Sequence, residues 1–384
     1  MLLQPCFPEV GRLCDIIRVV NQVEVQLPAQ PYSAYIEAGL LRRAGEWFVQ
    51  VLPEKRRLYV ITAPPVRKHW GDALMDSLSG AKLEAQVFEM PDGERHKTLA
   101  TIGDLAGKLV RKGADRKSII MAFGGGVVGD VAGFVASIYM RGIDVVQIPT
   151  TLLAQVDASI GGKTGVDLPE GKNLLGSFHQ PRAVLIDPAV LATLPEREYR
   201  SGLYEVLKYG VIRRREIFEF MEQNRERILQ RDPAALEWII TESVKVKAEV
   251  VAADEREGDL RRILNFGHTL GHALEAETRY RQFLHGEAVA WGMVAASMIA
   301  AAMQKTDAET ARRIISSVLA YAPLPRVESR GKQVVKRLCS DKKTLNGVVH
   351  FVLPLELGKV EIVSDVPERA VVQAVEELRY LSQA

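Results

Sequence analysis

The sequence has few cysteines and no excess of charge of either sign. Among its 384 residues there are three cysteines, Cys6, Cys14 and Cys339, and no two of them form a CxxC pair. Such scattered cysteines exclude a disulfide framework, and a reducing cytoplasm is the expected location. The formal net charge is only +2. The chain therefore has no basic field that would attract nucleic acid, and we expect no nucleic-acid partner.

Long hydrophobic runs are also missing. The longest mainly apolar run, 288–303, has 16 residues, whereas a membrane-spanning helix needs about 20. Its many alanines favour a tightly packed internal helix instead. The N-terminal stretch is interrupted by two prolines, Glu9 and Arg12 and lacks a basic start, which is unlike a secretory signal peptide. We expect neither a membrane segment nor a membrane partner.

The first half of the chain alternates between strand-like and helix-like segments. Apolar runs end near glycine or proline, and amphipathic stretches of helical period follow them. This βαβα order predicts an α/β domain with a parallel, Rossmann-like sheet covered by helices, which we place at 23–194. Strands are expected at 56–62, 83–90, 118–126 and 144–151, and helices at 66–78, 98–113 and 127–140.

The second half is mainly helical in pattern from about Pro195 onward. Apolar residues recur at intervals of three and four, and charged residues occupy the other faces. A short hairpin is expected at 347–363 and a closing amphipathic helix at 366–381. We therefore predict a mostly α-helical domain at 195–384, with the functional site in the cleft between the two domains.

A glycine turn follows the strand expected at 118–126. Residues 124–129, GGGVVG, fit the pattern G-x-G-x-x-G between a strand and a helix, where backbone N–H groups and the helix dipole bind a pyrophosphate. The alternative is a tight turn without a ligand. Asp144 lies at the start of the next strand instead of its end, so a dinucleotide would bind in a geometry that differs from the standard one.

A polar stretch, 150–180, comes next and is expected to be a loop. It carries Asp157, Lys163, Lys172 and Asn173 among several glycines. A solvated surface loop is one interpretation. Long glycine-bearing loops beside the carboxyl edge of a sheet often hold sites, however. Lysine and asparagine side chains in such a loop suit a phosphorylated ligand with several hydroxyl groups.

Three of the seven histidines fall within 268–285. His268 and His272 are four residues apart, so a helix places them on one face, and His285 follows a break in the pattern. Glu205, on another expected helix, could complete two imidazoles and one carboxylate, a set that leaves an open position on a catalytic zinc. The spacing favours His268 and His272, but the residues alone do not decide which two histidines bind. Lys208, Lys247 and Arg261, taken singly, are expected to be surface charges.

Many separated motifs, in order and over about 24–365, resemble 3-dehydroquinate synthase, a member of the sugar phosphate cyclases. The matching segments are PDGERHK (91–97), FGGGVVGDVAGFVAS (123–137), YMRG (139–142), PTTLLAQVDASIGGKTGVDLPEGKNLLGSF (149–178), GLYEVLKYG (202–210), ADEREGDLRRILNFGHTLGHALE (253–275), HGEAVAWGM (285–293) and DKKTLNG (341–347).

The resemblance implies an enzyme of the shikimate pathway, a phosphate-eliminating lyase that contains NAD and zinc or cobalt. It would convert 3-deoxy-D-arabino-heptulosonate 7-phosphate to 3-dehydroquinate and phosphate. Transient oxidation at C5 would be followed by β-elimination of phosphate, reduction, ring opening and an intramolecular aldol reaction. In this family pattern Glu205, His268 and His285 hold the metal, and His272 belongs to the substrate side.

The same resemblance implies roles for further residues. The phosphate group of the substrate is assigned to Lys163, Asn173, Arg261, His272 and one of Lys342 and Lys343, with Lys343 our choice. The substrate hydroxyl groups are assigned to Asp157, Lys208, Lys247 and Asn265. Arg141 matches an arginine that reaches the site of a neighbouring subunit, which implies a homodimer. NAD is assigned to Asp92, Glu94, Lys97, Gly125, Gly126, Val127, Val128, Gly129, Asp130, Thr150, Thr151, Lys163, Lys172 and Thr193.

The chain departs from the family pattern in three places. Ala63 stands where the family usually has Asp or Asn to hold the adenosine end of NAD, Tyr204 replaces a frequent alanine, and residues 1–22 form an arm without a match. Alternatives are a related cyclase acting on another sugar phosphate, a metal-dependent NAD alcohol or polyol dehydrogenase, and a sugar-phosphate-binding protein without catalysis. Leu264, Asn265 and His272 keep the dehydroquinate synthase pattern, which favours that substrate.

Overall fold

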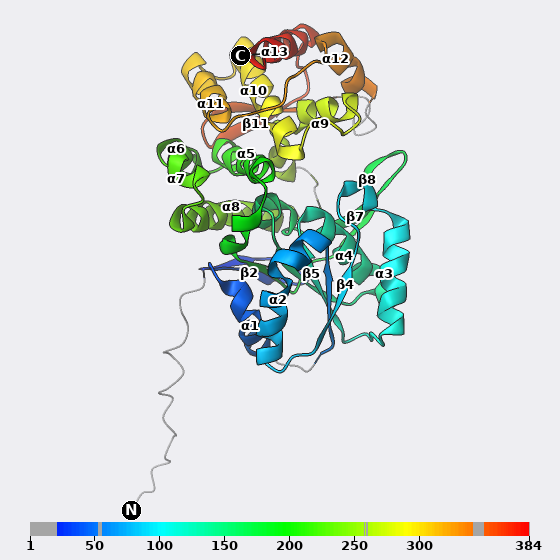
Figure 1. Cartoon of the computed structure of the whole chain (residues 1–384). Coiled ribbons are helices and arrows are strands. Elements are labelled where there is room, and N and C mark those ends of the chain that lie inside the picture. Colours follow the sequence, from blue (N-terminus) through cyan, green and yellow to red (C-terminus); the bar gives the residue numbers. More distant parts are fainter. Residues whose placement is uncertain (1–20, 53–55, 257, 259, 341–348, 384) are drawn as a thin grey trace, which may run out of the picture.

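A computed structural model of the chain describes residues 21–52, 56–256, 258, 260–340 and 349–383 (Figure 1). Residues 1–20 of the expected arm, and both Lys342 and Lys343, lie outside the described residues. Residues 21 and 22 do not belong to an arm, because they open the first strand of the sheet. No helix over the described residues is long and apolar enough to cross a bilayer.

A seven-stranded, mostly parallel sheet forms the N-terminal part, as the sequence predicts. Its strand order is β1-β2-β9-β6-β5-β3-β4, and only the pair of β1 and β2 is antiparallel. The strands are β1 (Asn21–Val25), β2 (Tyr32–Ile36), β3 (Leu58–Thr62), β4 (Ala85–Glu89), β5 (Ile119–Gly124), β6 (Asp144–Pro149) and β9 (Ala183–Ile186).

Alternate side chains of the central strands pack against helices on both faces of the sheet. In β3, Leu58 and Val60 contribute to the core beneath α1 and α2, whereas Tyr59 and Ile61 contribute to the core beneath α3 and α4. The two-residue period of a strand requires this division. Strands β3 and β5 are buried along their whole length because helices cover both faces of the sheet. The helices are α1 (Ala44–Val51), α2 (Pro64–Gly80), α3 (Leu99–Arg111) and α4 (Gly126–Ile138).

The prediction of a loop at 150–180 is wrong. This stretch contains the helical segment η4 (Ala154–Ala158) and the hairpin of β7 (Lys163–Leu168) and β8 (Gly171–Phe178), which projects from the body in Figure 1. Gly165 and Gly176 are cross-strand partners, and a Cβ at Gly176 would stand 2.1 Å from the backbone oxygen of Thr164. These glycines therefore permit close pairing of two backbones, although in sequence they resemble turn residues.

The C-terminal part is helical with one small hairpin, as predicted. Helix α10 is buried along most of its length, which confirms the internal helix expected at 288–303. The 3-10 segment η5 (Pro188–Thr193) precedes the first helix, and the domain boundary at 194/195 stays a prediction. The elements are α5 (Glu196–Ile212), α6 (Arg215–Gln223), α7 (Arg225–Leu229), α8 (Pro233–Ala253), η6 (Leu260–Asn265), α9 (His268–Glu277), α10 (His285–Ala302), α11 (Ala308–Ala320), α12 (Gly331–Ser340), β10 (Phe351–Glu356), β11 (Lys359–Val363) and α13 (Glu368–Leu381).

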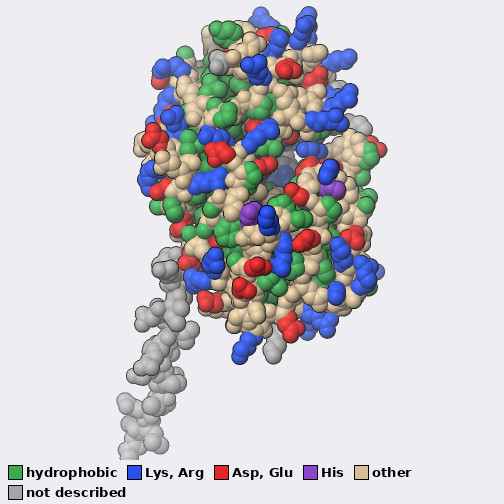
Figure 2. Space-filling view, in the orientation of Figure 1, with side chains coloured by type: hydrophobic (Ala, Val, Ile, Leu, Met, Phe, Trp, Pro, Cys, Tyr) green, Lys and Arg blue, Asp and Glu red, His purple; other side chains and the backbone are tan. Residues whose placement is uncertain are grey.

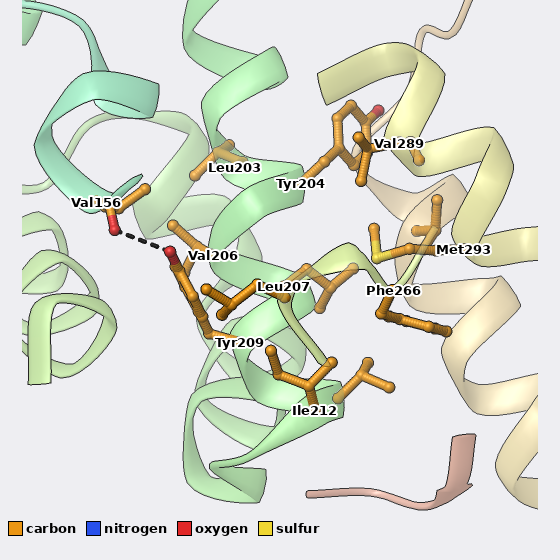
Figure 3. Close-up of a cluster of buried hydrophobic side chains, with 14 of the residues drawn as sticks. Val156, Leu203, Tyr204, Val206, Leu207, Tyr209, Ile212, Phe266, Val289 and Met293 are labelled. Atoms are coloured by element: carbon orange, nitrogen blue, oxygen red, sulfur yellow. Dashed lines mark hydrogen bonds between the residues drawn. The ribbon is translucent and has the colours of Figure 1, made fainter. Parts of the chain in front are cut away.

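Helix α5 lies at the centre of the largest hydrophobic core. Figure 3 shows Tyr204 directed toward Val289 of α10, while Tyr209 points to the opposite side and donates a hydrogen bond of 3.1 Å to the backbone oxygen of Val156 in η4. One helix is thus packed against both η4 and α10. This packing fixes α5 relative to the segments that carry Asp157 and His285. On the face of the molecule shown in Figure 2, positively and negatively charged side chains are interspersed, in keeping with the small net charge.

Candidate metal and cofactor site

Three helices bring a carboxylate and two imidazoles together. Glu205 lies on α5, His268 opens α9 and His285 opens α10. The Oε1 atom of Glu205 lies 3.8 Å from Nε2 of His268 and 3.7 Å from Nε2 of His285. Their ligand atoms all lie within 4.8 Å of one another. An oxygen and two ring nitrogens at these separations can converge on one metal ion.

The electrostatics of these residues suit a cation. Glu205 is fully buried; its Oε2 forms an ion pair with Lys208, whereas its Oε1 accepts no hydrogen bond from the described residues. Burial, reinforced by the nearby Lys208, holds the pKa of His268 well below its usual range. That imidazole is therefore neutral and has a free lone pair, the form in which histidine binds a metal.

A second group of possible ligands shares His285. His272, Glu275 and His285 also have ligand atoms within 4.8 Å of one another. Glu275 Oε2 lies 3.5 Å from Nδ1 of His285, the ring nitrogen that does not face Glu205. The pair that spacing favours, His268 and His272, has ring centroids 5.4 Å apart. The ion-pair contacts of Glu205, however, go to His268 and His285.

A buried polar cluster lies beside α5. Lys247 of α8 forms an ion pair of 2.5 Å with Oδ1 of Asp157, and the hydroxyl of Tyr209 donates to the same oxygen at 2.5 Å. Burial alone would raise the pKa of Asp157, but the positive charges of Lys247 and Lys208 hold it well below its usual range. Burial lowers the pKa of Lys247 to about 8. Lys247 and Lys208 are both buried and are therefore not the surface charges that the sequence led us to expect.

Arg261 is buried too, which corrects the expectation of a surface charge. Its side chain donates to the backbone oxygens of Glu255 at 2.8 Å and Gly161 at 3.4 Å. Its Nε makes no hydrogen bond with the described residues. Gly161 is held in turn by the hydroxyl of Tyr32, which accepts from its N–H at 2.9 Å. A buried guanidinium with an unused donor is suited to an anion.

The glycine turn opens α4 at the carboxyl end of β5, the context predicted from the sequence. Gly125 is the N-cap of α4, and no side chain caps this helix. A Cβ at Gly125 would stand 3.0 Å from Cγ2 of Thr151, so the turn and the segment after β6 lie against each other. The first N–H groups of α4 remain available to an anionic group. Gly126, Val127, Val128 and Gly129 form the first turn of α4, and Thr150 directly follows β6.

Lys97, Asp130 and Asn173 meet beside this turn. The buried Lys97 ammonium lies 2.5 Å from Oδ2 of Asp130 and donates to the side chain of Asn173. Burial raises the pKa of Asp130 to about 6, against the opposing effect of Lys97. Asn173 has a positive φ of 55° in β8, held by a 2.8 Å bond from its N–H to Asp167. The hairpin is thus tied to the glycine turn.

Lys172 connects the two parts of the candidate site. Its ammonium lies 3.6 Å from Oε1 of Glu94 and 3.9 Å from Oε1 of Glu275 on α9. It also lies 4.5 Å from the ring centroid of Tyr280. An NAD candidate on the hairpin therefore contacts the helix that carries two of the histidines.

The remaining predicted residues are placed as follows. Asp92 and Lys163 are exposed, Asn265 is the last residue of η6, two residues before Gly267 caps α9, and Arg141 is exposed with a φ of 71°. Thr193 is exposed and accepts a hydrogen bond of 2.7 Å from the indole of Trp70.

The sequence reasoning did not single out Glu275 and Tyr209. Glu275 is three residues after His272 and seven after His268, and Tyr209 is four after Glu205. Each is thus on the same helix face as a candidate ligand, a signal that spacing could have supplied.

Comparisons with known proteins find one family along most of the chain. The families described as 3-dehydroquinate synthase N-terminal and 3-dehydroquinate synthase C-terminal match residues 87–201 and 202–344. The chain is 61% identical over 363 residues to a 3-dehydroquinate synthase of Koribacter versatilis (strain Ellin345), covering 94% of this chain and 99% of that protein.

Two solved structures share the fold over most of their length. ValA, a 2-epi-5-epi-valiolone synthase from Streptomyces hygroscopicus subsp. jinggangensis 5008 with NAD+ and Zn2+ bound, has a TM-score of 0.83 and 29% identity, covering 91% of this chain and 97% of that one. A 2-deoxy-scyllo-inosose synthase complexed with carbaglucose-6-phosphate, NAD+ and Co2+ also has a TM-score of 0.83, at 25% identity, covering 93% and 99%.

Proposed function

The chain belongs to the 3-dehydroquinate synthase family and has the activity of that family, and we propose here which of its residues hold the metal, the cofactor and the substrate. The substrate is 3-deoxy-D-arabino-heptulosonate 7-phosphate, and the products are 3-dehydroquinate and phosphate. The observation that carries the proposal is the convergence of Glu205, His268 and His285 beside a buried cluster of cations.

Glu205, His268 and His285 hold a zinc or cobalt ion. The fit rests on a buried carboxylate whose Oε1 faces two imidazoles and accepts no hydrogen bond from the described residues, and on a neutral His268. When bound, such an ion supplies a Lewis acid for the C4 and C5 hydroxyl groups of the substrate. Lys208 lies against the same carboxylate and balances its charge before the ion binds.

Asp157, Lys208, Lys247 and Asn265 orient the hydroxyl groups of the substrate. Asp157 is held ionised by Lys247 and Tyr209, so it can accept a hydrogen bond from a hydroxyl group. The substrate phosphate is bound by Arg261, Lys163, Asn173, His272 and Lys343. The unused Nε of Arg261 supports this assignment, because a cation with a free donor can stabilise the charge of a leaving phosphate.

NAD lies along the glycine turn. The first N–H groups of α4 lack a side-chain cap and lie beside Thr151, which is the arrangement that binds a pyrophosphate. When bound, NAD supplies a transient oxidation at C5 that is reversed within the same turnover. Asp92, Glu94, Lys97, Asp130, Thr150, Lys163, Lys172 and Thr193 complete the set of residues proposed for the cofactor.

The enzyme acts as a homodimer in which Arg141 reaches the site of the other subunit. Several large apolar side chains are exposed near Arg141 and on the hairpin, namely Ile138, Met140, Leu174, Leu175 and Phe178. Their exposure supports an interface with a second copy of the chain, because large apolar patches on a surface mark contact sites. Arg141 itself has a left-handed backbone, a strained conformation for a residue other than glycine that tends to be kept at functional positions.

Phosphate release from the heptulosonate phosphate tests the proposal. Purified protein is assayed with and without NAD+, and again after treatment with a chelator, while the absorbance of NADH is followed. We expect release that needs both NAD+ and metal, with no net NADH. Net NADH would indicate a dehydrogenase. No release from protein that demonstrably holds NAD+ and metal would indicate a related cyclase with another sugar phosphate.

A further inference from the structure

Glu275 is a buried carboxylate to which the proposed function gives no role. It lies on α9, one turn after His272, and is only 4% exposed. Its two oxygens have different neighbours. Oε2 faces Nδ1 of His285 at 3.5 Å, and Oε1 faces the ammonium of Lys172 at 3.9 Å. A carboxylate is rarely buried without such neighbours, since removal of its charge from water is costly.

The contact with His285 fixes which way that imidazole faces. His285 uses Nδ1 toward Glu275 and Nε2 toward Glu205, so the two carboxylates lie on opposite edges of one ring. A carboxylate at Nδ1 keeps a proton on that nitrogen, so Nε2, which faces Glu205, is the ring nitrogen left for a metal ion to bind. It also increases the electron density that the ring offers to a metal.

The contact with Lys172 anchors Glu275 from the other domain. Lys172 lies on β8 of the hairpin, whereas Glu275 and His285 belong to the helical C-terminal part. Because Lys172 also lies 3.6 Å from Glu94, the ammonium is held between two carboxylates. Glu275 therefore keeps its orientation through partners on two sides.

We propose that Glu275 is a positioning residue: its carboxylate holds the His285 imidazole with Nε2 toward Glu205, and it thereby sets the affinity of the metal site without binding the ion. This inference rests on the metal site proposed above. The alternative is that Glu275 is itself a ligand, together with His272 and His285. In that case Glu205 and His268 would be dispensable for binding.

The test measures Zn2+ affinity without substrate or NAD, by competition with a chromophoric chelator. The variants are Glu275→Gln, which keeps the shape but loses the charge, and Glu275→Asp, which keeps the charge but is too short to hold His285. The matched control is Glu277→Gln, two residues further along α9 and on another face of the helix. His268→Ala distinguishes a positioning carboxylate from a ligand. Thermal unfolding of each metal-free protein is measured in parallel.

We expect both Glu275 variants to bind Zn2+ about 10–100-fold more weakly, the range found when a residue that orients a metal ligand is lost. Their metal-free unfolding temperatures should match the wild type, Glu277→Gln should bind normally, and His268→Ala should lose the ion. Wild-type affinity in a folded Glu275 variant would overturn the inference, as would an ion retained by His268→Ala. Absence of Zn2+ binding by the wild-type chain would overturn the metal site itself, and the inference with it.

Discussion

The contact between α5 and α10 at Gly286 determines whether the proposed metal ligands can meet. Gly286 follows His285, and a Cβ at this position would stand 1.9 Å from the backbone oxygen of Ser201, one turn before Glu205 on α5. Real Cβ atoms essentially never come closer than 3.0 Å to another heavy atom. The substitution Gly286→Ala therefore forces the two backbones apart by about 1.1 Å, the difference between 3.0 and 1.9 Å.

We expect Gly286→Ala to lower the free energy of unfolding by about 1–3 kcal/mol, the usual cost of overpacking. Zn2+ binding should weaken by about tenfold or more, because metal–ligand distances tolerate deviations of only about 0.2 Å. The matched control is Gly103→Ala in α3, where a Cβ meets nothing within 4 Å. That variant should gain about 0.5–1 kcal/mol, the helix preference of alanine over glycine, and should bind Zn2+ normally.

Urea unfolding of the metal-free proteins gives the stability difference, and chelator competition gives the Zn2+ affinity. Wild-type Zn2+ affinity in a folded Gly286→Ala protein would refute the reasoning, since it would mean that the separation of α5 and α10 does not determine the ligand geometry. Equal loss of affinity in both glycine variants would also refute it, because Gly103 lies in the sheet-covering helix α3, away from the three ligand-bearing helices.

His285→Ala should lose both the bound metal and the activity, whereas His272→Ala should keep the metal but have a lower kcat. Both outcomes are checked by measuring the metal content after dialysis and kcat on the same samples. Because burial lowers the pKa of Lys247 to about 8, kcat/KM should fall as the pH rises through this value and the ammonium loses its proton. Asp157 raises that pKa, so in Asp157→Asn any residual activity should fall at lower pH, which a pH–rate profile tests. Ala63 is the N-cap of α2 without a side-chain cap, but it is only 2% exposed. Ala63→Asp should tighten NAD binding, as measured by calorimetry, whereas urea unfolding should show that burial of the carboxylate offsets the gain of about 1 kcal/mol from the new cap.

The alternating elements of the first half were predictable because each carries its own local pattern. Strand β3 is a short apolar run, and α3 has an amphipathic period that ends near Gly113. We predicted no strand at β1, β2 or β9. Strand β1, with the sequence NQVEV, buries only two of its five residues, and β9 has four residues in all. Such short segments are recognised as strands only once the neighbouring strand that pairs with them is known.

The charged residues of the site could not be placed from local pattern alone. Lys247 can be buried because its ammonium donates a hydrogen bond to the carboxylate of Asp157, 90 positions earlier. Arg261 can be buried because the backbone oxygens of Glu255 and Gly161 accept hydrogen bonds from its guanidinium group. From the sequence alone, a lysine or arginine without a visible partner is predicted to lie on the surface, since burial of an unpaired charge is costly. The partners come from other elements, so only the fold, or a resemblance that already contains the fold, predicts the burial.

The histidines show what their spacing in the sequence cannot say about the neighbours of Glu205. An interval of four residues says that His268 and His272 share a face of α9, but it carries no information about a second helix. The approach of that second helix is set by glycines. A Cβ at Gly292 of α10 would stand 1.8 Å from the backbone oxygen of Gly267, directly before His268, and a Cβ at Gly286 would meet α5 just as closely. Helices α9 and α5 therefore both pack closely against α10. This packing brings His285, the first residue of α10, next to Glu205 of α5 and His268 of α9. The glycines in NFGH, HGE and WGM thus carry information about the proposed metal site that the histidines alone do not.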